Sequence, residues 1–153
     1  MDEFQKHLKE AIKNIRIADH MTYVTFPLVN EKRLLLKIFD EIYKAIVNCI
    51  YSLLYYEHLI RKLHIYENLN NDLESFFKIA KNYNVSNRQL KKINEIIELN
   101  KKHSQSVMEF VKKEKVVMMS NSLKTEFIDL ITLKEYLLLA KEFLMILSKR
   151  VQR

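Results

Sequence analysis

Glycine is absent from this chain of 153 residues, although average usage would give roughly eleven. Glycine supplies the tight and left-handed backbone conformations on which phosphate-binding loops, dinucleotide-binding turns and nucleophile elbows depend. Those three kinds of site are therefore excluded. Because there is also a single proline, Pro27, the sequence predicts long helices joined by short turns rich in Asn and Ser.

Cysteine and long apolar runs are scarce as well. Cys49 is the one cysteine, so no disulfide can form within the chain, and its apolar surroundings predict a buried, reduced thiol in a cytoplasmic protein. The most apolar uncharged segment, 45–56, has only 12 residues, whereas a membrane-spanning helix needs about 20. We therefore expect no contact with a membrane.

The first half of the chain shows clear helical periodicity. Apolar residues recur every three or four positions over about 2–23 and predict a first helix there. Pro27 is expected to end that segment, because the residue before a proline is pushed out of helical geometry. Asn30 is then expected to cap a second helix over about 31–66, whose middle is apolar on every side. Such a helix is buried all round, either by its own domain or by a second subunit.

Three shorter helices are predicted in the rest of the chain. Asn71 or Asp72 can cap a short helix that reaches Ala80, and the pair Ser86 and Gln89 has the capping-box pattern that opens another, ending near 103–106. A second capping box, Thr132 and Glu135, predicts the start of the last helix.

One stretch reads as β-structure. Two apolar runs, 116–119 and 125–130, flank the turn-forming residues 120–122 and predict a β-hairpin. Short connections make neighbouring helices antiparallel. The sequence thus predicts a single helical domain over 1–153, an all-α up-down bundle of about five helices with a long N-terminal αα-hairpin and a small β-hairpin before the last helix.

The formal net charge is +7, with 26 Lys and Arg against 19 Asp and Glu. Nearly all of the excess lies after residue 85, and five bases fall on the predicted helix that begins near Ser86: Arg88, Lys91, Lys92, Lys101 and Lys102. Such a surface attracts phosphates, and because Lys outnumbers Arg 20 to 6 it favours backbone contacts over base readout. The alternative is a solvated face of lysines.

A second basic feature lies on the first predicted helix. Its members step by three and four residues and so share one helix face: Lys6, Lys9, Lys13, Arg16 and His20. The stripe can contact RNA or an acidic partner. A solvated face, diluted by nearby carboxylates, is the alternative interpretation.

Two Arg–His pairs are the weak candidates for catalysis. Arg16 and His20 are four residues apart, and Arg61 and His64 are three apart, so each pair is expected to share a helix face. Such a pair can position a phosphate and move a proton, as metal-independent RNA cleavage requires; surface or capping roles are the alternative. One cysteine, scattered histidines and the absence of Glu-x-x-His predict no metal site and no cofactor.

Segments 17–29 and 109–120, with the long apolar helix between them, resemble an uncharacterised family of small archaeal helical proteins, for which no established activity carries over. The long helical hairpin followed by shorter helices also resembles, more loosely, a HEPN-type bundle. That resemblance implies a bundle that dimerises, and in some members RNase activity from an Arg-x4–6-His motif. Neither Arg16/His20 nor Arg61/His64 has the spacing of that motif.

The sequence therefore favours a non-catalytic binding module for RNA or another polyanion, acting through the basic second half and the stripe on the first helix. The alternatives are a HEPN-type metal-independent RNase and a protein-interaction subunit. A homodimer that buries part of the 31–66 helix is the expected assembly.

Overall fold

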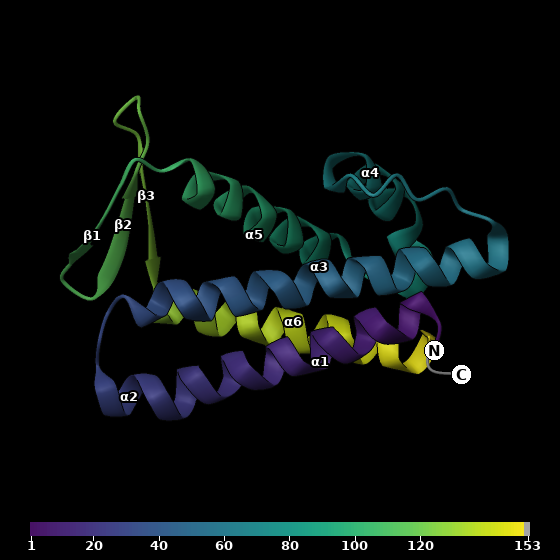
Figure 1. Ribbon diagram of the computed structural model, residues 1–153, viewed down its shortest axis with the longest axis horizontal. Coiled ribbons are helices and arrows are strands. Elements are labelled where there is room, and N and C mark those ends of the chain that lie inside the picture. The colour runs from purple at the N-terminus through teal and green to yellow at the C-terminus, as the bar shows by residue number, and fades with distance from the viewer. Residues whose placement is uncertain (152–153) are drawn as a thin grey trace.

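The computed structural model of the protein describes residues 1–151. It is mostly helical, with one small antiparallel sheet (Figure 1). Three long helices form the body of the molecule: α1 (Glu3–His20), α3 (Leu34–Arg61) and α6 (Leu130–Val151). α1 and α3 run antiparallel, and α6 packs against both of them. The predicted helical fold is confirmed at this level, and the sheet is an addition at one end of the bundle.

The chain stays helical through Pro27, contrary to expectation. A π-helical turn, η1 (Met21–Thr25), continues α1 and leads directly into α2 (Phe26–Val29). The π turn shifts the hydrogen-bond register, so that Phe26 donates to the carbonyl of Met21 and Pro27 falls in the first turn of α2. A proline is tolerated there because its missing N–H has no partner to lose. Asn30 ends α2 in a left-handed conformation and does not cap α3.

α3 is the centre of the core and ends earlier than predicted. Its middle is covered by other elements of the same chain, with Ile42, Ile46, Ile50 and Leu53 fully buried. The interior position of this helix therefore comes from its own domain. The helix ends at Arg61, because Lys62 adopts a left-handed conformation and the His58 ring bonds the carbonyl of Leu63.

α4 (Leu69–Ile79) begins earlier than expected, with Asn68 at the cap position instead of Asn71 or Asp72. The Asn68 side chain accepts from the amide of Asn71 and caps the helix. Asp72 lies inside the helix and is fully buried, where it accepts from Tyr51 and from the backbone amides of Tyr66 and Asn68. This carboxylate therefore holds the loop between α3 and α4.

The predicted start and end of α5 (Asn87–Gln105) are confirmed. Ser86 and Gln89 form a complete capping box, each side chain accepting from the other's backbone amide. The 3-10 turn η2 (Ala80–Tyr83) precedes this cap. The buried face of the helix consists of the apolar positions that the periodicity picked out: Leu90, Ile93, Ile96 and Ile97.

The sheet has three strands, in the order β1 (Met108–Lys112), β2 (Lys115–Met119) and β3 (Thr125–Asp129). The predicted hairpin of β2 and β3 is confirmed, whereas β1 was missed. The last helix begins at Leu130 instead of after Thr132. Asp129 sits at its start and accepts from the Thr132 amide, so the predicted capping box does not form.

Six residues take over the conformations that glycine usually serves. Each has a positive φ: Asn30, Lys62, Glu67, Asn84, Lys113 and Leu123. All six lie in turns or helix ends, where the short elements of this fold reverse direction. Non-glycine residues are uncommon in this region, so the absence of glycine is accommodated at the connections and leaves the helices uninterrupted.

Candidate polyanion-binding surface

The bases on α5 are largely matched by carboxylates. Lys101 pairs with Glu98 one turn away (3.2 Å), Lys102 pairs with Glu126 on β3 (2.7 Å), and Lys92 lies 3.8 Å from Glu135 on α6. Glu95 adds a further exposed carboxylate to the same helix. Five bases thus face four acids, and beyond about one Debye length such pairs leave little net field.

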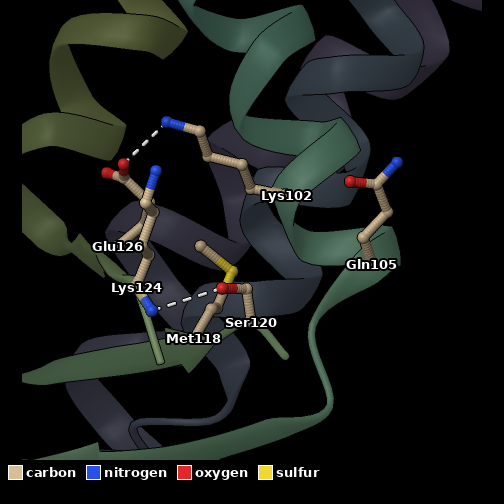
Figure 2. A pocket seen from close by; sticks show the side chains of 6 residues that line it. All are labelled: Lys102, Gln105, Met118, Ser120, Lys124 and Glu126. Atoms are coloured by element: carbon tan, nitrogen blue, oxygen red, sulfur yellow. Dashed lines mark hydrogen bonds and ion pairs between the residues drawn. The ribbon is translucent and has the colours of Figure 1, made fainter. Parts of the chain in front are cut away.

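Figure 2 shows how one of these bases is held. Lys102 extends from α5 to Glu126 beside a pocket of about 240 Å³ between the end of α5 and the sheet. Met118 lines the pocket, and Ser120 accepts from the backbone amide of Lys124 on its other side. The Lys102 ammonium is thus directed at a carboxylate of the same protein.

Arg88 and Lys91 are the two predicted α5 bases that have no carboxylate partner. Both are exposed near the start of the helix. In residues 1–151, no carboxylate oxygen lies within 4.0 Å of either side chain. They leave a small cationic area at one end of α5.

The outer face of α1 is different, because most of its bases have no acidic partner. Lys9, Lys13, Arg16 and His20 are all exposed, and their spacing places them on one face over about 16 Å of helix. No carboxylate of the described chain lies within 4.0 Å of the two lysines or Arg16. Lys6 is the exception, since it pairs with Glu3 at 3.0 Å.

α6 adds two further bases beside this face. Lys134 and Lys141 lie over the Tyr23 ring, 5.4 and 5.8 Å from its centroid, and Lys141 also pairs with Asp19. Tyr23 follows α1 directly, so the two helices meet there. Without counting His20, this surface has five cationic side chains and two carboxylates, and so retains a net positive charge: Lys9, Lys13, Arg16, Lys134 and Lys141 against Glu10 and Asp19.

Arg16 and His20 lie one turn apart on this exposed face, as predicted. The His20 ring is exposed and makes no hydrogen bond with another residue of the described chain. Both side chains are therefore open to solvent, and Lys9 and Lys13 lie on the same face of the helix.

The second Arg–His pair does not share a helix face. α3 ends at Arg61, and His64 lies in the following loop with its ring edge-on to Tyr66, at 4.4 Å between centroids. Arg61 instead donates to Glu57 (2.7 Å), a carboxylate that is only 5% exposed. The expected pairing fails because the helix stops before it reaches His64.

Arg61 lines a cleft of about 350 Å³ between the end of α3, η2 and α6. The Tyr83 hydroxyl donates to the same Glu57 oxygen that Arg61 bonds. Arg150 lies over the Tyr83 ring at 5.3 Å and donates to the Asn82 carbonyl. Burial, and then the bond to Glu57, raise the pKa of Tyr83. The cluster thus fastens η2 to two helices.

Sequence reasoning missed a polar chain between α1 and α3. His7 Nδ1 donates to Asn48 (2.9 Å), Asn48 donates to Asn14 (3.0 Å), and Asn14 donates to Glu41 (3.0 Å). The His7 ring also stacks on Tyr55 at 5.4 Å. The sequence feature that could have indicated this chain is Asn14, a polar residue on the apolar stripe of the first helix.

Three further predictions concern Cys49, metal binding and membrane spans. The thiol is fully buried, as expected, and burial raises its pKa. In the described chain there is no group of three or more His, Cys, Asp or Glu residues that could hold a metal ion. Among the helices of residues 1–151, none has the length and apolarity needed to cross a membrane.

Comparison with known proteins gives no relative: no family model matches the chain, and no curated protein matches it. The resemblances to an archaeal helical family and to HEPN bundles therefore stay predictions.

Proposed function

We propose that this protein is a non-catalytic module that binds the phosphate backbone of RNA or of a similar polyanion, mainly through the outer face of α1. The observation that carries the proposal is the contrast in pairing. The α1 bases Lys9, Lys13 and Arg16 have no carboxylate within 4.0 Å in the described chain, whereas three of the five α5 bases do.

An unpaired surface base binds phosphate at a lower cost than a paired one. A lysine in an ion pair must leave its carboxylate, or carry that carboxylate's repulsion, before it contacts a phosphate. Binding by unpaired bases also releases the counterions condensed on the nucleic acid, which makes affinity fall steeply with salt. Among the bases of α5, Arg88 and Lys91 therefore contribute most to binding.

The chemistry of the face favours backbone contact over base recognition. Two of its three unpaired bases are lysines, which act as point charges and do not form the bidentate contacts that read base edges. We therefore expect little sequence preference. Single-stranded and double-stranded ligands of similar charge density should both bind.

The test compares two triple variants that remove the same charge. Lys9→Gln, Lys13→Gln and Arg16→Gln together remove three unpaired bases, and Lys92→Gln, Lys101→Gln and Lys102→Gln remove three paired ones. Binding to a labelled single-stranded RNA is followed by anisotropy across a salt series. The α1 triple should reduce the slope of log K against log salt by about 2, and the α5 triple should leave it nearly unchanged.

Two results would contradict the proposal. Equal losses in both triples would mean that net charge alone matters, and no binding by the unaltered protein at low salt would leave the α1 face as a solvated surface. Recovered RNA is examined on a gel, where we expect it intact. Cleavage that disappears in an Arg16→Gln, His20→Asn variant would instead support the RNase alternative.

A further inference from the structure

The outward face of α6 carries three large apolar side chains in a row. Ile131, Leu138 and Met145 are seven residues apart and are 73%, 58% and 61% exposed. The opposite face of the same helix is buried in the core, through Leu133, Leu137, Ala140 and Leu147. Single exposed apolar residues are normal on protein surfaces, but a regular stripe along a helix is typical of an interaction site.

Charges of opposite sign border the two edges of this stripe. Lys141 follows Leu138 by three residues and Glu142 by four, so a helix of 3.6 residues per turn places them on opposite sides of it. Lys134 and Glu135 repeat the arrangement one heptad earlier. The stripe thus has a lysine edge and a glutamate edge.

The neighbouring elements confirm which edge is which. On the lysine side, Lys141 pairs with Asp19 of α1, and both lysines lie over Tyr23. On the glutamate side, Glu135 is 3.8 Å from Lys92 of α5. The lysine edge therefore borders α1 and the glutamate edge borders α5.

We propose that two copies of this chain pair through α6, with the two helices parallel and related by a two-fold axis along them. A rotation about that axis places the lysine edge of one copy against the glutamate edge of the other. A two-fold axis perpendicular to the helices makes them antiparallel and brings lysine to lysine and glutamate to glutamate. Like charges facing each other are unfavourable, so the charge pattern selects the parallel pair.

The geometry of the stripe agrees with such a pair. A seven-residue repeat drifts by about 20° per heptad on a straight helix, and two helices follow that drift by crossing at about 20°. In the parallel pair each stripe residue meets its own counterpart, and Lys134 of one copy lies at nearly the same height as Glu135 of the other. The expected seam is thus α6, and not the interior helix α3 that the sequence had suggested.

The size of the contact sets its expected strength. α6 has 22 residues, a length of about 33 Å, and one helix from each copy contributes a contact near the lower end of stable interfaces. We therefore expect an equilibrium between monomer and dimer that depends on protein concentration, with a dissociation constant on the order of micromolar.

The first test is sedimentation of the protein without nucleic acid, so that its outcome is independent of polyanion binding. The unaltered chain should shift from monomer to dimer as concentration rises. Leu138→Lys should remain monomeric, whereas Leu59→Lys, at a residue 55% exposed near the end of α3, should dimerise normally. A chain that stays monomeric throughout, or a dimer that tolerates Leu138→Lys, overturns the proposal.

Charge exchange tests the pairing of the edges. Lys134→Glu makes both edges of the stripe acidic near residue 131, and Glu135→Lys makes both edges basic there. Because like charges then face each other in the homodimer, each variant alone should dimerise less. An equimolar mixture should recover dimerisation, because the acidic edges of one variant then meet the basic edges of the other. Both sites are exposed, so the fold should tolerate the changes. A mixture no better than its components contradicts the edge assignment.

Cysteine cross-linking tests the orientation. Cys49 is fully buried, so an introduced surface cysteine reacts alone. In the parallel pair, Ile131→Cys and Met145→Cys should each form a disulfide between identical chains under oxidation. An antiparallel pair would instead link these two variants to each other and leave each unlinked by itself. That result would disprove the parallel arrangement even if a dimer forms.

Discussion

The outer faces of α1 and α5 are both rich in bases, but the residues that surround those bases differ. Both helices carry several bases at helical spacing, and both were candidates for polyanion contact. On α5 the lysines meet carboxylates, of which Glu126 and Glu135 come from β3 and α6. On α1 most of the bases face solvent alone. The same residue type is therefore neutralised on one helix and available on the other.

This difference shows that the sequence gives the number of bases on a helix, whereas the tertiary neighbours determine whether those bases are free to bind a phosphate. The carboxylates that neutralise Lys92 and Lys102 lie far along the chain, where no local pattern indicates them. On α1, Asp19 is turned toward Lys141 and Glu3 toward Lys6, so the local acids leave the central bases uncovered.

The inner face of α1 should be far more sensitive to substitution than its outer face. Asn14 is buried and bridges Asn48 and Glu41. Asn14→Ala should lower the free energy of unfolding by about 2 kcal/mol, because it leaves the half-buried Asn48 amide and the half-buried Glu41 carboxylate without this partner. The adjacent Lys13→Ala should change it by less than about 0.5 kcal/mol. Urea denaturation of both variants measures the two values.

The outcome decides whether the outer bases serve the fold. If Lys13→Ala destabilises the protein as much as Asn14→Ala does, the bases on the outer face of α1 stabilise the fold. Their presence there would then no longer indicate a ligand-binding surface. Polyanion binding by Asn14→Ala, measured at a temperature where the variant is folded, should be unchanged.

The second prediction converts α5 into a surface like α1. Glu98→Gln, Glu126→Gln and Glu135→Gln together leave Lys101, Lys102 and Lys92 without carboxylates. Affinity for single-stranded RNA should rise about tenfold at low salt, and the salt slope should steepen by about 2, because three more bases can release counterions. Anisotropy titrations across a salt series measure both quantities.

The matched control for that gain removes three carboxylates elsewhere. Glu31→Gln, Glu67→Gln and Glu74→Gln lie at exposed positions and raise the net charge by the same amount. A similar gain in the control would show that overall charge governs affinity, and the contrast between the two helices would lose its meaning.

Much of the fold was predictable because local rules decide it. Apolar periodicity identified the buried faces of the helices, and the Ser86–Gln89 capping box located the start of α5. The errors lie where a neighbour overrides a local rule. A π turn carried the helix through Pro27, Asp129 replaced the expected cap at Thr132, and β1 was missed because its turn uses Lys113 at positive φ instead of glycine.

The candidate surface was predictable only as a set of residues. The sequence identified the bases of both helices, but pairing such as that of Lys102 with Glu126 depends on how β3 packs beside α5. The expected Arg61–His64 pair failed for a related reason, since the length of α3 is set by the left-handed Lys62. The polar chain through Asn14 required knowledge of how α1 and α3 align, which no local pattern gives.

The smallest expected effect concerns the energy of the α5 pairs themselves. Lys102 and Glu126 are joined at 2.7 Å, but their side chains are 53% and 44% exposed. A double-mutant cycle with Lys102→Ala and Glu126→Ala should give a coupling below about 1 kcal/mol, since exposed ion pairs are well solvated. The coupling should vanish near 1 M salt, where the Debye length is about 3 Å. A coupling above about 2 kcal/mol that survives high salt would mean that α5 keeps its lysines for stability, and that its low availability to phosphate is a property of the fold that removing the acids cannot reverse.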